Sequence, residues 1–298
     1  MQYLKSFTLA SEQQELEFLL HSPLFDMSCY NRMSAYPFKI FPFKGLRRLE
    51  FAPVTVIYGG NGSGKSTLLN IIAEKLELHR SAPFNESHLM EHYLRFCSYE
   101  MYDGTSAPPP GSEIITSDGV FDFLLDLRAI NQGVDRRREE LFDEYRDTID
   151  DCRYNGYQMR SLEDYDELKR RNEARRATKS QYVSRRLGAV EQESRSNGES
   201  AFGYFTSKIK ENALYLLDEP ENSLSATLQA RLAEFLSDSA RFYGCQFIIS
   251  THSPFLLSMK GAKIYDLDAA PAAVRKWSEL ENVRAYFELF DQKRQDFE

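Results

Sequence analysis

The chain has 298 residues, of which 42% are hydrophobic and 28% are charged, and it carries a formal net charge of −8. These values are typical of a soluble globular protein whose length allows a large core, built as one domain with an insertion or as two lobes. The negative charge excludes a general attraction to nucleic acid, and no apolar run reaches the roughly 18 residues of a membrane-spanning helix.

The first informative segment is residues 59–67, GGNGSGKST, which match the phosphate-loop pattern G-x-x-x-x-G-K-[ST] without a mismatch. The apolar run before it, residues 54–58, predicts a buried strand, and the apolar positions within 66–76 predict a helix. This order of strand, loop and helix is the context that the motif requires. The loop amides and the start of the helix then form a site for phosphate.

The phosphate loop also predicts which residues hold a nucleotide. Lys65 can reach the β and γ phosphates, and the Ser66 hydroxyl can hold Mg²⁺. Upstream, Tyr36, Phe38 and Arg47 are candidates for adenine contacts, although core packing is the favoured interpretation of the aromatic residues. The predicted nucleotide-binding residues of the loop are Gly60, Asn61, Gly62, Ser63, Gly64, Lys65, Ser66 and Thr67.

Residues 114–125, IITSDGVFDFLL, have the shape of a polar step leading into a helix. In the simplest interpretation, Ser117 and Asp118 form a helix N-cap and a first-turn acid that the helix dipole favours. No glutamine lies between Lys65 and Asn131.

Charge is distributed unevenly farther along the chain. Residues 139–167 hold eleven acids and three arginines, whereas residues 169–186 hold eight bases and one acid. A turn signal at 154–157 and a capping box at 161–164 separate two helical segments. We therefore expect an inserted helical hairpin over about 134–187, with arms at 134–154 and 162–187, the first acidic and the second becoming basic.

Three interpretations of this hairpin stay open. The arms attract each other, and the insertion is then a lever, a lid or a docking site for a partner. Alternatively, the basic stretch 169–186 faces outward and binds the phosphate backbone of nucleic acid, which would make binding depend steeply on salt. Only Tyr182 lies among these bases, so base stacking is not indicated. The third interpretation is a charged face that is merely solvated.

The paired acids follow a second buried strand. Residues 214–217 are apolar and run directly into Asp218 and Glu219, which predicts a central strand of a parallel sheet, buried on both faces. Because ligands bind beyond the carboxyl ends of such strands, Asp218 is placed to hold Mg²⁺ and Glu219 to orient or deprotonate the attacking water. A third apolar strand, 246–251, ends at His252.

Together these motifs resemble those of the ABC-type ATPases. The resemblance is carried by Asn61, by SNGE at 196–199, by LDEP at 217–220 and by STH at 250–252. It is strongest to small soluble bacterial proteins usually labelled AAA-family or predicted ATPases, and it covers about 20–75, 110–130 and 195–298. That group is related to the chromosome-maintenance and repair ATPase heads.

The resemblance implies that the nucleotide site is completed by a second subunit. Ser196, Gly198 and Glu199 open a helix that, in the family, contacts the γ-phosphate bound by a partner in a head-to-tail dimer holding two ATP molecules. His252 is similar to the family's switch histidine, whose imidazole can bond the γ-phosphate or the attacking water. The implied catalytic residues are therefore Lys65, Glu219 and His252.

Three departures or open points qualify the resemblance. Asn197 stands where transporter ATPases have glycine, which argues against a transporter partner. The family's usual Mg²⁺-sensing glutamine has no clear counterpart, and Asp118 is the candidate replacement, with the simple helix-start interpretation equally open. The loop 221–225 either crosses the dimer interface, as in the family, or is a plain polar turn.

The expected fold is α/β: a P-loop NTPase with an ABC-type head, a mixed sheet flanked by helices, and an inserted helical lobe carrying the hairpin. The expected parts are 1–77 and 213–298 as the two halves of the ATPase core, and 78–212 as the lobe. The chain starts without the apolar core of a secretion signal, and its cysteines form no C-x-x-C pair, so we expect a cytoplasmic protein with reduced thiols and no zinc site. The cysteines are Cys29, Cys97, Cys152 and Cys245.

The expected function is an ATP- and Mg²⁺-dependent dimerisation switch that hydrolyses ATP. The alternatives are a nucleotide-gated module that docks a nuclease or other effector protein, and an ATPase stimulated by DNA. A transporter ATPase subunit is the least favoured, and no membrane partner is expected.

Overall fold

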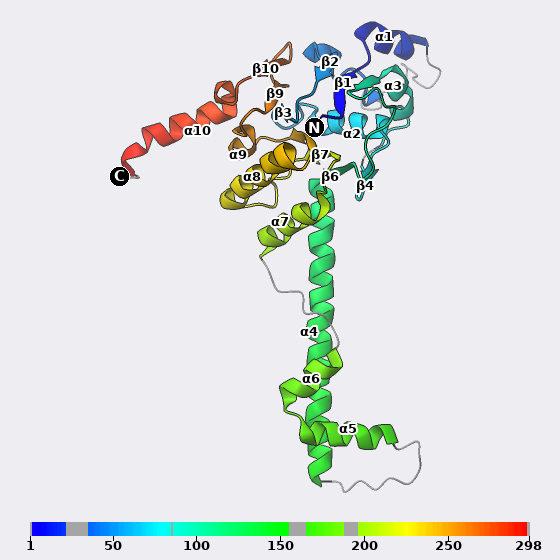
Figure 1. Ribbon diagram of the computed structural model, residues 1–298, viewed down its shortest axis with the longest axis vertical. Helices are drawn as coiled ribbons and strands as arrows, with labels where there is room; N and C mark the ends of the chain where they lie inside the picture. Colours follow the sequence, from blue (N-terminus) through cyan, green and yellow to red (C-terminus); the bar gives the residue numbers. More distant parts are fainter. Residues whose placement is uncertain (1, 22–34, 85, 155–164, 188–195, 297–298) are drawn as a thin grey trace. The chain divides into compact units, whose positions relative to one another are not determined.

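A computed structural model describes residues 2–21, 35–84, 86–154, 165–187 and 196–296 (Figure 1). The chain divides into two compact units. We call Met1–Asp122 with Ser196–Glu298 the head unit, and Phe123–Arg195 the inserted unit. Helix α4 (Ser117–Tyr154) begins in the head unit and continues into the inserted unit.

A seven-stranded sheet forms the centre of the head unit, in the order β10-β9-β3-β8-β7-β6-β4. Among the described strands its pairings are parallel, except that β10 runs antiparallel to β9, so the expected mixed sheet is confirmed. The strands are β3 (Val54–Tyr58), β4 (His79–Arg80), β6 (Glu113–Thr116), β7 (Leu214–Asp218), β8 (Gln246–Ser250), β9 (Lys263–Asp266) and β10 (Ala273–Arg275).

The three strands that carry the sequence motifs lie side by side. Every residue of β3 and of β8 is buried, as are the first four of β7, which accounts for their unbroken apolar sequences. Ser250 pairs with both Ile57 and Asp218, and Thr116 pairs with Asp218. The carboxyl ends of β3, β8, β7 and β6 therefore meet at one edge of the sheet.

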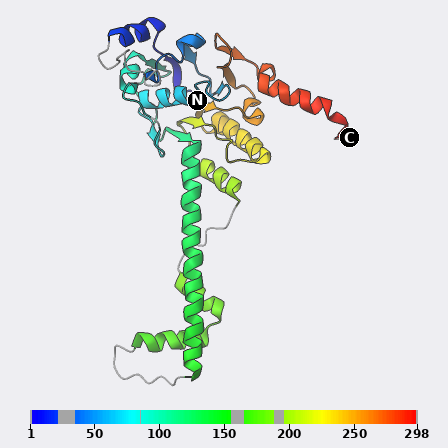
Figure 2. The ribbon, with the colours of Figure 1, turned by 180° about the vertical axis from the view of Figure 1, so that it is seen from behind.

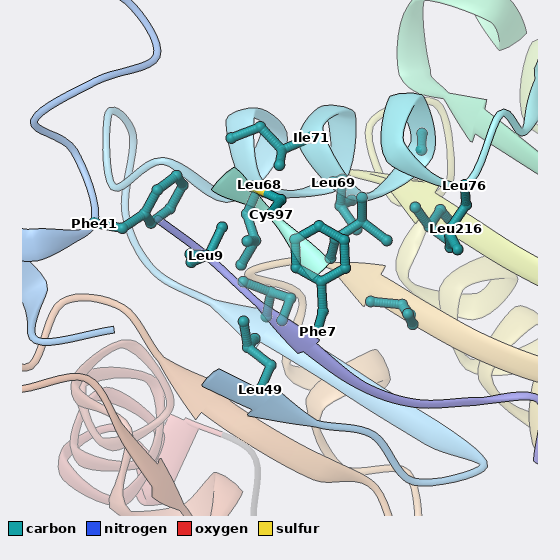
Figure 3. Packing of buried hydrophobic residues seen from close by; sticks show 14 of the residues in the cluster. Phe7, Leu9, Phe41, Leu49, Leu68, Leu69, Ile71, Leu76, Cys97 and Leu216 are labelled. Atoms are coloured by element: carbon teal, nitrogen blue, oxygen red, sulfur yellow. The ribbon is translucent and has the colours of Figure 1, made fainter. Parts of the chain in front are cut away.

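A second sheet packs on the helix that follows the phosphate loop. It is antiparallel, in the order β2-β1-β5, and consists of β1 (Leu4–Thr8), β2 (Arg48–Glu50) and β5 (Ser98–Met101). Helix α2 (Lys65–Lys75) lies beside it, and Figure 3 shows Leu68 and Ile71 of α2 packed in one cluster with Phe7 and Leu49. This core fixes the direction in which the start of α2 points.

The remaining helices of the head unit lie around these sheets, except α10, which extends away from them at the C-terminal end (red in Figure 2). Helices α2 and α8 both contact β8 of the large sheet. The helices are α1 (Glu12–His21), α3 (Met90–Phe96), α7 (Asn197–Lys208), α8 (Ala226–Phe242), α9 (Pro254–Leu257) and α10 (Glu281–Gln292), with short 3-10 turns at Pro42–Lys44, Trp277–Glu279 and Arg294–Asp296. None of the described helices combines the length and the apolar character needed to cross a bilayer.

The inserted unit differs in its elements from the expected hairpin. Its first helix, α4, has 38 residues and starts at Ser117 rather than at 134. The second arm is two helices, α5 (Tyr165–Arg176) and α6 (Lys179–Leu187). The break has a local cause, because Thr178 and Gln181 exchange side-chain and backbone hydrogen bonds as a capping box that starts α6. The turn expected after Tyr154 and the capping box expected at 161–164 lie outside the described residues.

A small core holds α4 against α5 and α6. Leu141 is fully buried, and the Tyr145 hydroxyl donates to the carbonyl oxygen of Ala177 at 3.2 Å. The core residues are Leu141, Ala174, Ala177, Tyr182 and Val183, with Phe142, Tyr145 and Ile149 packed around them.

The boundary between the two units falls inside α4 and not at residue 78. Strands β4, β5 and β6, which the expected boundaries assigned to the helical lobe, belong to the sheets of the head unit. β6 belongs to the head unit because its residues 113–116 pair in parallel with residues 215–218 of β7 in the central sheet.

Candidate nucleotide site

The phosphate loop connects β3 to α2 with its outer rim open to solvent. Gly62 and Gly64 have φ angles of 78° and 94°, a region that favours glycine. A Cβ added at Gly64 would also lie 3.1 Å from Cγ2 of Ile40, a tight approach that the isoleucine would have to relieve. Gly60, Asn61 and Gly62 are exposed, so this part of the loop is accessible to a ligand.

Lys65 joins the loop to the paired acids. Its side chain is only 4% exposed, and its Nζ donates to the carbonyl oxygens of Gly59 at 2.7 Å and Gly60 at 3.1 Å. The same Nζ lies 3.5 Å from Oε1 of Glu219. A buried ammonium group thus stands between the loop and the carboxylate at the end of β7.

Ser66 and Asp218 meet at the position expected for Mg²⁺. Oγ of Ser66 donates to Oδ1 of Asp218 at 3.1 Å, and the Ser250 hydroxyl donates to the same oxygen. Burial raises the pKa of Asp218, while the hydrogen bonds from Ser250 and Ser66 act in the opposite direction. The carboxylate is therefore costly to bury without a cation.

This pair fits Mg²⁺ bound together with a nucleotide. Within the described part of the chain, no group of three or more His, Cys, Asp or Glu side chains could hold a metal by itself. Mg²⁺ usually takes one or two carboxylates and completes its shell with waters and substrate phosphates. One hydroxyl and one carboxylate beside a phosphate loop match that requirement.

Glu219 adopts an unusual backbone conformation next to this pair. Its φ angle is 48°, which is uncommon for a residue with a Cβ. Its N–H donates to the carbonyl oxygen of Ser250 at 3.0 Å, and its Oε2 accepts from Nδ2 of Asn222 at 3.0 Å. The carboxylate is held between Asn222 and Lys65 and stays partly open to solvent.

His252 stands just beyond the end of β8. Its side chain is 43% exposed, and its Nδ1 lies 3.5 Å from Oε1 of Glu221, a buried carboxylate that sequence analysis did not assign to the site. The His252 backbone N–H donates to the same oxygen at 2.9 Å. The structure therefore brings His252 to the same edge of the sheet as Asp218 and Glu219.

Asp118 lies on the neighbouring connection. Because Thr116 pairs with Asp218 across β6 and β7, Asp118 is two residues beyond the strand position that adjoins the site. It is exposed in the first turn of α4. The cap of this helix comes from Thr116, whose hydroxyl accepts the Gly119 N–H at 3.3 Å, and not from Ser117.

Ser196 and Glu199 start α7 as expected. The two residues form a capping box: Oγ of Ser196 accepts the Glu199 N–H at 3.3 Å, and Oε2 of Glu199 accepts the Ser196 N–H at 3.1 Å. A Cβ at Gly198 would lie 2.9 Å from Cδ1 of Leu228 on α8, so a larger residue there would require the leucine side chain to shift. Within the described residues, Ser196 makes its hydrogen bonds with Glu199 and not with the phosphate loop.

The adenine candidates separate by burial. Phe38 is 3% exposed and lies between the rings of Phe18 and Tyr93, so it is a core residue. Tyr36 packs against the same core, whereas Arg47 is exposed. The favoured interpretation of the aromatic residues as packing groups agrees with these positions.

Two further charged residues border the site without a sequence signal. Arg80, on the edge strand β4, donates to Asn70 at 3.0 Å and pairs with Glu74 at 3.3 Å. Burial lowers the pKa of Arg80, and the charges of Glu74 and Asp218 raise it. On the other side, Oδ2 of Asp268 accepts the Gly60 N–H at 2.7 Å. Arg80 and Asp268 lie outside the sequence motifs of the site. They come close to it because the order of strands in the sheet places their segments there.

The basic stretch 169–186 is largely engaged within the inserted unit. Oε1 of Glu144 on α4 accepts from Arg186 at 2.8 Å and from the Tyr182 hydroxyl at 3.2 Å, and it lies 3.5 Å from Arg170. Arg171 pairs with Asp151. These contacts favour the interpretation in which the oppositely charged arms attract each other.

A protein-family model described as "AAA domain, putative AbiEii toxin, Type IV TA system" matches residues 85–258. A search of curated proteins found no match.

Similar solved structures include two SMC head domains. One, from Pyrococcus furiosus, has an extended coiled coil and is bound to the C-terminal domain of ScpA; it is 14% identical, with a TM-score of 0.43, over 99% of this chain and 100% of that chain. The other, from Thermotoga maritima, is 15% identical, with a TM-score of 0.37, over 93% of this chain and 99% of that chain.

Proposed function

Since this chain belongs to the AAA-domain family whose model matches residues 85–258, we propose that it binds ATP with Mg²⁺ and hydrolyses it as an ATP-dependent dimerisation switch. The observation that carries this proposal is the meeting of Lys65, Asp218 and Glu219 at the carboxyl ends of neighbouring parallel strands. Ligands of open α/β sheets bind at such a place.

The loop and α2 supply the binding groups. The amides of the exposed residues Asn61 and Gly62 and the N-terminus of α2 attract the phosphates, and Lys65 exchanges its carbonyl partners for phosphate oxygens. Ser66 and Asp218 would hold Mg²⁺, with Asp118 as a further candidate. When bound, Mg²⁺ neutralises charge that develops on the phosphate oxygens.

Glu219 and His252 act on the attacking water. The Glu219 carboxylate accepts a proton from that water or orients it, while Asn222 and Lys65 fix the carboxylate in place. With a proton on Nδ1 beside Glu221, Nε2 of a neutral His252 ring accepts a hydrogen bond from the attacking water; a doubly protonated ring would instead donate to the γ-phosphate.

A second copy of the chain completes the site. Ser196, Gly198 and Glu199 start α7, whose N-terminal dipole favours an anion, and Ser196 and Glu199 are exposed in one chain. In a two-fold symmetric pair, each copy would offer this helix start to the ATP held by the other. The loop 221–225 would then lie along the shared interface.

A second candidate function is a nucleotide-gated interaction module, in which ATP binding drives assembly with an effector protein. The family description names a putative toxin of a Type IV TA system, and this supports the interaction module as a second candidate. The two candidates differ in turnover: a switch hydrolyses ATP by itself, whereas the module forms a stable complex with another chain and turns over little ATP. Stimulation of hydrolysis by added DNA would instead favour a nucleic-acid-dependent ATPase.

The test compares two site variants with a surface control. Phosphate release is measured for the native chain, Lys65→Ala, Glu219→Gln and Glu234→Gln, the last an exposed acid on α8. We expect Lys65→Ala to abolish ATP binding, Glu219→Gln to bind ATP but lose on the order of a hundredfold or more in kcat, and the control to match the native chain. Tight ATP binding by Lys65→Ala would refute the assignment of the loop.

A further inference from the structure

Glu221 connects the loop after the paired acids to the segment after β8. Its side chain is 5% exposed, and its Oε1 accepts the Thr251 hydroxyl at 2.6 Å and the His252 N–H at 2.9 Å. One carboxylate oxygen therefore fixes two consecutive residues at the end of the strand.

The same oxygen also faces the imidazole. Nδ1 of His252 lies 3.5 Å from Oε1 of Glu221. A carboxylate beside one ring nitrogen favours a proton on that nitrogen and sets the orientation of the ring. Since the His252 side chain is 43% exposed, the rest of the ring remains open toward a ligand.

Gln229 of α8 forms a second connection between the two segments. Its Nε2 donates to the carbonyl oxygen of Leu224 at 2.9 Å and approaches that of Glu221 at 3.5 Å. Its Oε1 accepts the Ser253 hydroxyl at 2.7 Å. Residues 221–224 and 251–253 are thus held together by two side chains rather than one.

A purely structural role does not account for a carboxylate at this position. Oε2 of Glu221 is buried and has no hydrogen-bond partner among the described residues. Burying a charged oxygen without a partner is costly, and a neutral side chain could accept the same two donors. The carboxyl group lies beside His252, where it can act on the ring.

We propose that Glu221 is a positioning residue that orients His252 and couples it to the loop 221–225. The inference rests on the proposed ATPase function. A displacement of the loop by a neighbouring copy or partner is transmitted through the Glu221 carboxylate to the imidazole. The Glu221 side chain therefore links the binding of a neighbouring copy or partner to the contact between His252 and the γ-phosphate.

The test is a double-variant cycle on ATP hydrolysis. We compare the native chain with Glu221→Gln, His252→Ala and the double variant, with Glu234→Gln as control. Glu221→Gln should lower kcat by about tenfold or more, as loss of a group that orients a histidine does, and leave KM for ATP within about twofold. The double variant should be no slower than His252→Ala, because Glu221 acts through that ring.

Two additional measurements separate positioning from misfolding and from failure of the ATPase proposal. Thr251→Val removes one hydrogen-bond donor to Glu221 but leaves the carboxylate, so it should lower kcat by a smaller factor than Glu221→Gln does. This variant tests the proposal if Glu221→Gln does not fold. Nitrogen-15 NMR of the His252 ring, assigned by its loss in His252→Ala, should show the proton on Nδ1 in the native chain and a change in Glu221→Gln.

The outcomes are distinguishable. An unchanged kcat and an unchanged ring spectrum in Glu221→Gln overturn the positioning role, as does a double variant whose losses multiply. If the native chain shows no ATP hydrolysis, the proposed function fails instead, and the ring spectrum alone decides whether Glu221 orients His252.

Discussion

At the scale of single residues, the ammonium group of Lys65 is buried close to the carboxylates that follow β7, and a bound nucleotide would contact the same groups. Lys65 is held by two loop carbonyl oxygens and by Glu219, while Asp218 is held by two hydroxyl groups. Each of these groups has a partner that a nucleotide and its cation could replace. The site is therefore ordered before a ligand binds, which reduces the entropy lost on binding.

Glu15 gives a prediction about stability close to the site. It lies on α1, is 2% exposed, and its Oε2 accepts the Lys39 N–H at 2.6 Å. Burial raises the pKa of Glu15 to about 7 from the ordinary value of 4.5, against the opposing hydrogen bond from Lys39. Ile40, next to Lys39, is in near contact with Gly64 of the phosphate loop, so this carboxyl group supports the segment beneath the loop.

The sign of the pH effect follows from proton binding. Between pH 4.5 and about 7 the folded chain keeps a proton on Glu15 that the unfolded chain has released. The free energy of unfolding should therefore fall as pH rises through this window, and the contribution should be constant above it. We expect Glu15→Gln, which is neutral throughout, to gain roughly 1–3 kcal/mol relative to the native chain between pH 5 and pH 8.

Urea unfolding at several pH values measures this difference. Glu17→Gln, an exposed acid on the same helix, is the matched control and should follow the native curve. Stability curves of Glu15→Gln and the native chain that stay parallel from pH 5 to pH 8 would show that Glu15 does not titrate in this range.

The residues that the sequence could predict are those in contiguous motifs. Lys65, Ser66, Asp218 and Glu219 were expected to meet because a phosphate loop and an acid-tipped strand both end at the same edge of a parallel sheet. Glu221 was not assigned to the histidine, because its contact with His252 depends on the register of β7 against β8. Such pairings between distant segments leave no trace in local sequence.

At the scale of elements, apolar runs predict strands well and helix breaks poorly. β3 spans the expected strand 54–58, and β7 spans the apolar run 214–217 with Asp218 as its last residue, because the apolar residues of both strands are buried. The two short helices α5 and α6 were merged in the sequence interpretation, since their charge pattern is continuous across the capping box at Thr178. Strand β4 has only two residues and is recognisable only from its pairing with β6.

The inserted unit gives a prediction at this scale. Leu141 of α4 is fully buried against α5 and α6, whereas Leu125 of the same helix is 44% exposed. Leu141→Ala should cost about 2–5 kcal/mol of local stability and Leu125→Ala much less, because only the first leaves a cavity. Hydrogen exchange should therefore speed up in α5 and α6 for Leu141→Ala and stay slow in β3, β7 and β8.

The Leu125→Ala control shows whether the change in exchange comes from the core around Leu141. Equal exchange of α5 and α6 in the two variants would mean that the small core around Leu141 does not hold these helices. Faster exchange throughout the head unit would mean that the two units do not open independently.

The start of α7 gives a second prediction at the scale of elements. Ser196 accepts the Glu199 N–H and so caps the helix. Ser196→Ala should cost about 1 kcal/mol of stability through the lost cap, and Ser196→Asp should restore it.

If Ser196 also contacts a neighbour's ATP, the aspartate variant should still fail to dimerise, because its charge repels the γ-phosphate. Thermal unfolding and light scattering of both variants separate the two roles, and a fully active Ser196→Asp dimer would leave Ser196 only the role of a cap.

At the scale of the whole molecule, the proposed dimer would divide each nucleotide site between two separate surfaces of the chain. The phosphate loop, Asp218 and Glu219 lie at one edge of the sheet, and Ser196 makes its described hydrogen bonds elsewhere, at the start of α7. In the proposed dimer, a single copy would offer a binding half to one ATP and a closing half to the other. Such a division would make hydrolysis depend on association.

The most direct test of the account is the molar mass of Glu219→Gln in solution, measured by light scattering with saturating ATP and Mg²⁺. The account predicts a dimer, twice the monomer mass of 34.5 kDa, and a monomer with ADP, with no nucleotide, or when Lys65→Ala is added. A Glu219→Gln protein that binds ATP tightly and remains at 34.5 kDa would contradict it.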